Sequence, residues 1–229
     1  MLRYKQEDLD WVTFAATQDK SSLTASEVVN GLNAADLASV FRCYGEERYA
    51  RRLSNAIYEY RKTVGPIRTT GQLKNLVLSV IPEATSSTAQ FRKDTVARVF
   101  QSLRIFVNDE LNELCTGLDL AYRLLKPDTG RLCVISFHSL EDRLVKRCFN
   151  LTREALNSSH TIAHTLAKST QKNARAFMRI EDFLQERESE KCPLWHHVQG
   201  PIEASLEEVK ENSRASSAKL RIGVKSVLL

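Results

Sequence analysis

The sequence predicts an α/β chain in which helices fill the first half and a strand–helix unit follows. Apolar residues recur every three to four positions across residues 24–81, which is typical of amphipathic helices. An apolar run with β-branched residues then stops abruptly on Ser-Phe-His-Ser near residue 136, and the C-terminal segment alternates like a strand. The 229 residues are 42% hydrophobic, which is enough to bury a core as one domain or two small ones.

Short helices with readable start signals follow an N-terminal loop at residues 1–23. Thr24 and Glu27 have the spacing of a capping box and begin a helix that ends near Gly31. Asn33 begins a second helix, which Gly45 ends.

A third helix is expected over residues 46–63, where apolar and aromatic side chains recur at helical spacing. Gly65 and Pro66 break it, and Thr69 or Thr70 caps a fourth helix that stops before Pro82. Residues 24–81 therefore predict a small helical bundle with short connections, and residues 83–93 predict a loop.

The segment from residue 94 to 125 is amphipathic but longer than most globular helices, so we expect a bend near Asn108 or Gly117. A turn at residues 127–130 precedes a strand at 131–137, whose apolar run predicts burial on both faces. Ser139 and Asp142 have capping-box spacing and predict the start of a helix with an apolar stripe.

The remaining chain divides into a polar segment at residues 150–191 and a C-terminal tail at 192–229 that ends in a strand. We expect the polar segment to be a variable, partly helical insertion, because it has few aromatic residues and is rich in Ser, Thr, Asn, Gln and Glu.

Polar and ionisable side chains gather where the predicted strand ends. In open α/β sheets, ligands bind beyond the carboxyl ends of strands, where a helix N-terminus also lies. The alternative is purely structural, with Ser139 and Asp142 capping the helix and His138 serving as a turn residue. Both interpretations stay open for the cluster of Ser136, His138, Ser139, Glu141 and Asp142.

The net charge of +5 and the bases flanking several helices fit a polyanionic partner, but they fit ordinary solvated surfaces as well. No apolar stretch reaches the roughly 20 residues that cross a bilayer, so we expect no membrane partner. The N-terminus lacks an apolar signal region. Five cysteines without a Cys-x-x-Cys pair predict reduced thiols.

Metal and hydrolase chemistry are poorly supported. His160 and His164 could share a helical face, but they lack the glutamate of a zinc protease and a clear third ligand, so we expect no metal site. Residues 136–142 lack a Gly-x-Ser-x-Gly elbow, and such close neighbours seldom form a triad.

Five motifs, in the same order along the chain, resemble the RsmH (MraW) family of rRNA cytosine-N4 methyltransferases. Their sequences are most similar to the animal mitochondrial members of that family. They are YGEERYARRLSNAI (44–57), IRTTGQL (67–73), ARVFQSLRIFVNDELNEL (97–114), GRLCVISFHSLEDRLVKRCF (130–149) and NSRASSAKLR (212–221). Ala97, Ser102, Ser213 and Ser216 depart from the family pattern.

The resemblance implies part of a class I, Rossmann-like methyltransferase sheet with an inserted helical substrate domain. Residues 24–93 would be that insertion, and residues 94–149 and the tail would belong to the sheet domain. It also implies S-adenosylmethionine as cofactor, small-subunit rRNA as partner and a mitochondrial location, with a cytoplasmic one as the alternative. It does not indicate the oligomeric state.

The family's cofactor loop has no counterpart here. The eight glycines are scattered, with no Gly-x-Gly, whereas close backbone approach to a cofactor needs such glycines. We therefore expect no cofactor-binding residues in this chain, which resembles the C-terminal part of a methyltransferase. The alternative is a non-catalytic RNA-binding or ribosome-assembly protein derived from the family.

By resemblance, the cluster after the strand lies beside the target base. We expect Ser136, His138, Ser139 and Asp142 to be catalytic, by contacting the base edge or supporting those contacts. The expected substrate-binding residues are Phe137, Glu141, Arg143, Arg98, Arg104 and Asn108, of which the last three grip RNA or tie the domains together.

Overall fold

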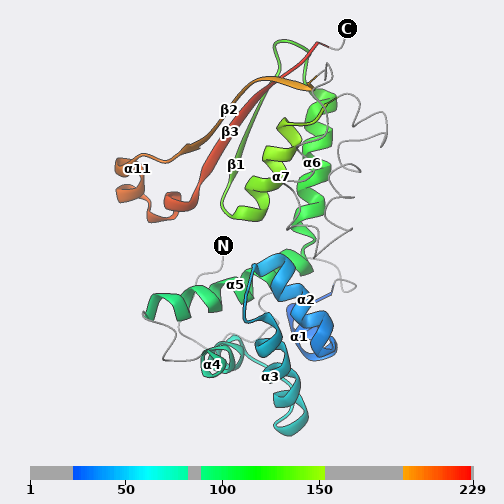
Figure 1. Cartoon of the computed structure of the whole chain (residues 1–229), viewed down its shortest axis with the longest axis vertical. Coiled ribbons are helices and arrows are strands. Elements are labelled where there is room, and N and C mark those ends of the chain that lie inside the picture. Colours follow the sequence, from blue (N-terminus) through cyan, green and yellow to red (C-terminus); the bar gives the residue numbers. More distant parts are fainter. Residues whose placement is uncertain (1–22, 82–88, 153–192, 228–229) are drawn as a thin grey trace. The chain divides into compact units, whose positions relative to one another are not determined.

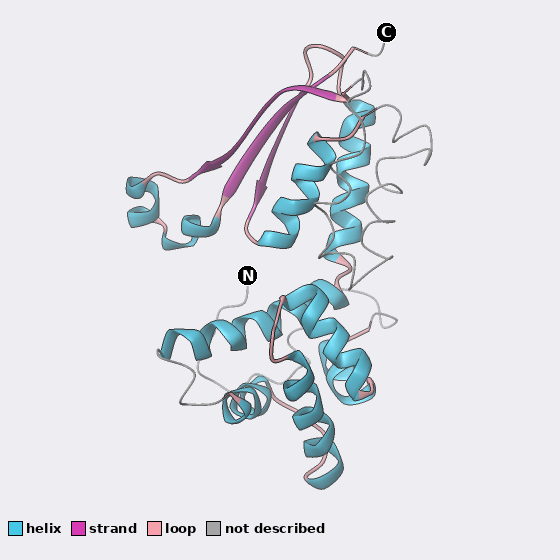
Figure 2. Cartoon of the chain, viewed as in Figure 1, coloured by secondary structure: helices cyan, strands magenta, loops and turns pink. Residues whose placement is uncertain are grey.

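The computed structural model describes residues 23–81, 89–152 and 193–227, and it divides the chain into two compact units (Figure 1). The first comprises Met1–Glu110 and the second Leu111–Leu229. In the described ranges the first unit is helical, and the second combines helices with a three-stranded sheet (Figure 2). The predicted mixture of helices and strands is confirmed.

The predicted starts of three helices in the first unit are confirmed. Thr24 and Glu27 form a full capping box, Asn33 Oδ1 accepts from the Asp36 amide, and Thr69 forms a second capping box. The helices are α1 (Ala25–Gly31), α2 (Ala34–Gly45), α3 (Ala50–Thr63), α4 (Thr70–Val80) and α5 (Ala89–Val107).

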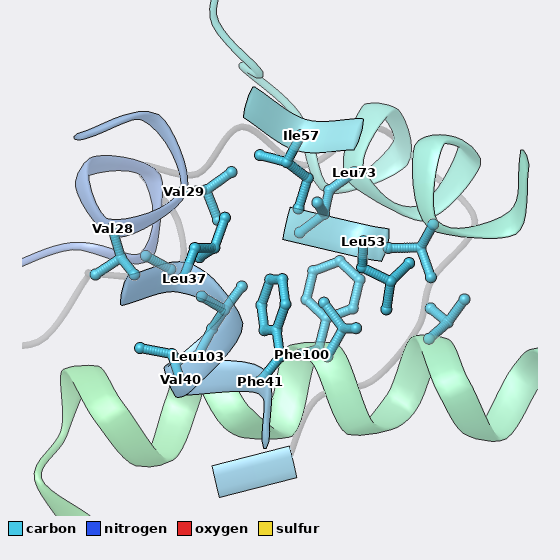
Figure 3. Close-up of a cluster of buried hydrophobic side chains, with 14 of the residues drawn as sticks. Val28, Val29, Leu37, Val40, Phe41, Leu53, Ile57, Leu73, Phe100 and Leu103 are labelled. Atoms are coloured by element: carbon cyan, nitrogen blue, oxygen red, sulfur yellow. The ribbon is translucent and has the colours of Figure 1, made fainter. Parts of the chain in front are cut away.

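The core of the helical unit is a layer of aliphatic and aromatic side chains from all five helices (Figure 3). Phe41 of α2 and Phe100 of α5 lie at its centre, and Leu53 and Ile57 of α3 reach it from another side (Figure 3). Each fully buried side chain of this size contributes about 1.5–3 kcal/mol. Burial of one stripe on every helix therefore holds the bundle together.

Two helix boundaries differ from the sequence expectation. α3 begins at Ala50 rather than at residue 46, because Glu46 takes a left-handed conformation (φ 48°) and Glu47 turns inward to full burial. α5 begins at Ala89, inside the expected loop, because Phe91 packs against the helical core. α5 thus completes the helical unit, and the boundary of an inserted domain at residue 93 stays a prediction.

The expected bend lies at the first of its two candidate positions. α5 ends at Val107, Asp109 adopts φ 51°, and α6 (Glu110–Leu124) follows. Gly117 lies inside α6, so no bend is needed there. The turn before the first strand is confirmed, with Asp128 at φ 65°.

The sheet has the order β1-β3-β2, and β3 is antiparallel to both neighbours. The strands are β1 (Arg131–Ser136), β2 (Trp195–Glu203) and β3 (Lys219–Lys225). The strand in the tail is therefore confirmed. β2 and the short helix α11 (Leu206–Glu211) were not predicted, and the 3-10 helix η3 (Ser213–Ser217) leads into β3.

One face of the sheet is covered by α6 and by α7 (Ser139–Phe149), as Figure 2 shows. There Trp195 packs edge-on against Phe149 and Tyr122, with ring centroids 5.1 and 5.3 Å away. Glycine at position 223 lets the Phe149 ring pack closely on this face, because a Cβ there would lie 2.7 Å from the ring. The helices and the sheet thus share an aromatic core.

The prediction that the first strand is buried on both faces is wrong. Ile135 is 59% exposed, and β1 is an edge strand paired only with β3 in the described part. Its residues alternate in exposure because the helices cover only one side.

No helix in the described ranges is long and apolar enough to cross a bilayer. The N-terminal loop, most of the polar segment at 150–191 and the histidines at 160 and 164 lie outside the described residues.

Candidate active site

The candidate site lies where β1 ends and α7 begins. His138 is the N-cap of α7, in an extended conformation. Its Nδ1 accepts a hydrogen bond from the Glu141 amide (3.3 Å), while the Glu141 carboxylate accepts from the amides of Phe137 (2.8 Å) and His138 (3.2 Å). The predicted capping box at Ser139 and Asp142 is therefore wrong by one residue, and His138 and Glu141 form it.

The capping bond fixes the protonation of the His138 ring. Because Nδ1 accepts a hydrogen bond, the neutral ring carries its proton on Nε2. Nε2 lies 3.1 Å from Glu141 Oε1, yet it makes no hydrogen bond of regular geometry in the described part of the chain. A buried donor left in this state is unusual in folded proteins.

Asp142 is held from across the sheet by Arg221 of β3. Arg221 donates from Nε (2.7 Å) and from the second guanidinium nitrogen (3.0 Å) to the two carboxylate oxygens. The side chains are only 8% and 15% exposed. This two-pronged pair anchors the first turn of α7 to the central strand.

The other residues predicted at this strand end differ in accessibility. Ser136 is buried, and its hydroxyl donates to the Lys219 carbonyl (3.4 Å). Phe137 and Ser139 are exposed, and Arg143 is half-buried. The structure thus gathers Ser136, His138, Glu141 and Asp142.

Both carboxylates are held in their charged form. Burial raises the pKa of Glu141, but the His138 ring nitrogen 3.1 Å away and hydrogen bonds from two backbone amides outweigh it, so the pKa lies below its ordinary value. Arg221 lowers the pKa of Asp142, chiefly through its hydrogen bonds and against a smaller effect of burial. The site is therefore anionic at neutral pH, and Arg221 balances one of its charges.

These lowered pKa values predict acid sensitivity of the sheet unit. The stabilisation is fully present above the ordinary values of 4.5 and 3.8 and is lost as pH falls through the folded-state values. Glu141→Gln keeps a side chain that can complete the capping box but does not titrate. We expect its melting temperature to fall less than that of the wild type between about pH 5 and pH 3.

Thermal denaturation followed by circular dichroism at several pH values measures this difference. Glu113→Gln, at an exposed position of α6, is the matched control and should follow the wild type. Equal acid sensitivity of Glu141→Gln and the wild type would contradict the prediction.

The three predicted substrate residues of the helical unit each contact an acid within that unit. Arg98 pairs with the fully buried carboxylate of Glu47 (2.8 Å). Arg104 binds both oxygens of Glu110 (2.7 and 2.8 Å), and Asn108 donates to Glu110 (3.1 Å). These bonds give all three residues structural roles, and RNA contact by them stays a prediction.

The described glycines do not cluster into a site for S-adenosylmethionine, since the sequence has no Gly-x-Gly. The described glycines with a close neighbour pack against this chain's own atoms: a Cβ at Gly45 would meet the Arg98 carbonyl, and one at Gly130 would meet the Lys126 carbonyl. Both glycines therefore serve close packing within this chain.

Arg221 is the site residue that sequence reasoning missed. It lies 79 positions from its partner Asp142, and no local spacing indicates the pair. The available signal was its position at the end of NSRASSAKLR, one of the five quoted motifs.

Comparisons with known proteins match almost the whole chain. The model of the MraW methylase family covers residues 15–226. Ribosomal RNA small subunit methyltransferase H of Bartonella grahamii is 40% identical over 208 residues, which are 90% of this chain and 54% of that protein. The 12S rRNA N(4)-cytidine methyltransferase METTL15 of Mus musculus is 39% identical over 211 residues, 88% of this chain and 49% of that protein.

The human protein of the same name is 37% identical over 211 residues, again 88% of this chain and 49% of that protein. The chain spans about half the length of these relatives. With this coverage and five matching motifs, the chain belongs to the MraW methylase family.

Proposed function

We propose that this chain is the RNA-facing part of an S-adenosylmethionine-dependent methyltransferase that modifies the N4 atom of a cytidine in small-subunit rRNA. Membership in the MraW methylase family and the printed names of the relatives support the reaction class. The observation that carries the proposal is the buried Nε2 of His138 at the carboxyl end of β1, which lies beside the Glu141 carboxylate but makes no hydrogen bond of regular geometry within the described residues.

In this proposal the site orients the base and handles its hydrogen bonds. A cytosine offers O2 and N3 as acceptors and the N4 amine as donor. His138 donates from Nε2 to an acceptor of the base, and the Glu141 carboxylate provides the negative field that favours loss of an amine proton. Asp142, paired with Arg221, holds the first turn of α7 in place. Exposed Phe137 stacks on the base or its neighbour, as aromatic residues do with unpaired RNA bases.

Ser136, Ser139 and Arg143 have supporting roles. The buried hydroxyl of Ser136 lies at Asp142 and the β3 carbonyl, so it positions the carboxylate. Ser139 and Arg143 line the first turns of α7 and reach the nucleotide backbone. These residues thereby support the contacts to the target base that are proposed for His138 and Phe137.

For the fold, we propose part of a class I sheet with residues 24–93 as an inserted substrate domain. Two features support further sheet beside β1: its outer edge has no partner in the described part, and the strand carries Ile135, which is 59% exposed. Apolar residues on an unpaired edge are avoided in finished sheets.

The cofactor is not assigned to residues of this chain in this proposal, because the sequence has no Gly-x-Gly. We place the protein in mitochondria, as the 12S rRNA named for the mammalian relatives suggests. The alternative location is cytoplasmic.

The second candidate is a non-catalytic RNA-binding or ribosome-assembly protein. One observation favours it: the sequence has no Gly-x-Gly. It predicts that the chain binds RNA but transfers no methyl groups, even when a relative supplies the rest of the enzyme.

A chimera separates the two functions. This chain replaces the 208 matched residues of the Bartonella grahamii relative, and transfer of radiolabelled methyl groups to small-subunit rRNA is measured. We expect activity, and His138→Ala and Ser136→Ala should lower it by about 10²-fold, the lower range for a lost acid–base or positioning group.

Lys146→Ala, an exposed position on the same helix, is the control and should keep the activity of the chimera. A folded chimera that binds RNA but transfers no methyl groups would favour the second candidate. Unchanged turnover in both site variants would refute the assigned roles.

A further inference from the structure

The outward side of α3 carries several basic residues and few acidic ones. Leu53 and Ile57 point into the helical core (Figure 3). With 3.6 residues per turn, the opposite side of the helix is shared by six residues. We call these the α3 outer face: Arg51, Arg52, Asn55, Tyr58, Glu59 and Lys62.

Helix stability does not explain the two arginines of this face. Arg51 and Arg52 lie in the first turn of α3, where the helix dipole disfavours positive charge. The helix also has no side-chain cap and no acid in that turn, unlike α1 and α2. Neither guanidinium has an ion pair or hydrogen bond within the described ranges, so both are available to a ligand.

Basic side chains at both ends of α3 lie against aromatic rings. Lys62 Nζ lies 4.2 Å from the centre of the half-buried Tyr58 ring. Just before the helix, the guanidinium of Arg48 lies 4.7 Å from the Phe91 ring and 5.3 Å from the Tyr49 ring. Basic side chains together with aromatic rings are the combination that binds single-stranded nucleic acids.

We propose that the α3 outer face, together with Arg48, binds the sugar-phosphate backbone of a single-stranded RNA segment. From Arg51 to Lys62 the helix rises about 16 Å, which suits a polymer of repeated charges better than one small anion. The inference rests on the proposed function, because RNA is the substrate there, and it adds where that RNA is held.

The test is the double variant Arg51→Glu/Arg52→Glu in the full chain. Its affinity for a fluorescent single-stranded RNA is measured by anisotropy between 50 and 200 mM salt. We expect roughly tenfold weaker binding at low salt. Loss of two phosphate contacts should also make the slope of log affinity against log salt shallower by about 1.4.

Folding does not confound this variant. Acids in the first helical turn are favourable, so its melting temperature should equal or exceed that of the wild type. The control is Lys126→Glu/Lys210→Glu, which makes the same charge change at exposed positions of the other unit and should bind RNA within about threefold of the wild type.

Three results overturn the proposal. If the control loses as much affinity as the α3 variant, net charge alone explains binding. If polyglutamate binds the wild type and loses affinity in the variant as RNA does, the face takes acidic protein. If the wild type binds no RNA, both this surface and the proposed RNA substrate fail, whereas the first two results leave that substrate standing.

Discussion

Trp195→Ala is expected to lower the free energy of unfolding of the sheet unit by about 3–5 kcal/mol. The side chain is 2% exposed and makes edge-on contacts with Phe149 and Tyr122. Its removal leaves a cavity between β2, α6 and α7, because two rings lose their common neighbour. Burial around the same cluster also raises the pKa of Cys148 to about 12, which marks a dry interior.

Trp195→Phe separates ring packing from the polar atom. Among the described residues Trp195 Nε1 is buried without a regular hydrogen bond, and the Cys148 thiol is only a weak acceptor beside it. Phenylalanine removes that unsatisfied donor and keeps most of the ring, so we expect a loss below about 1.5 kcal/mol.

Urea denaturation followed by circular dichroism gives these energies, and hydrogen exchange of residues 193–227 locates them in the sheet unit. Val198→Ala is the matched control on the same strand, because Val198 is 42% exposed. A Trp195→Ala loss no larger than that of the control would show that the aromatic cluster does not hold this unit together.

Features fixed by neighbouring residues were the ones that could be predicted. The caps at Thr24, Asn33 and Thr69 each satisfy the backbone amide three residues ahead, so sequence spacing shows them directly. The same spacing occurs at Ser205 and Glu208, which form a capping box at the start of α11, although no helix was predicted there.

Local spacing predicted the wrong cap for α7, because two pairs of residues could each form a capping box there. Ser139 with Asp142 and His138 with Glu141 both have the spacing of a capping box. The longer Glu141 side chain reaches back to the amides of Phe137 and His138, and the shorter Asp142 carboxylate is taken by Arg221. The choice therefore depends on a contact that arises only when β3 pairs with β1.

Strand β2 was missed because its signal is irregular. Its pairing with β3 contains two register shifts, one on each side of Gln199. Histidines and a Gly-Pro pair interrupt its alternation. Its position comes instead from burial of Trp195 and from ladder bonds to a strand that lies later in the chain.

The candidate site was predicted as a location but not as an arrangement. The end of an apolar run followed by polar side chains indicated where a ligand would bind. The placement of His138 Nε2 beside Glu141 and the pairing of Asp142 with Arg221 follow from the cap and from β3, which no local pattern describes.

Arg221→Leu is expected to cost about 3 kcal/mol of unfolding free energy, the lower end for breaking a buried ion pair. The change leaves the Asp142 carboxylate, only 15% exposed, without the two hydrogen bonds that compensate its burial. The pKa of Asp142 should then rise, because the largest cause of its lowering is removed.

The double variant Asp142→Leu/Arg221→Leu tests whether the charge is the cause. Replacing both partners removes the stranded carboxylate, so it should recover most of the lost stability, as apolar substitutes for buried pairs often do. Urea denaturation of the wild type, both single variants and the double variant gives the coupling energy, for which we expect more than about 1 kcal/mol. Additive losses would mean that Arg221 stabilises through its aliphatic stem against the helices, and the pair would then not be what anchors α7 to the sheet.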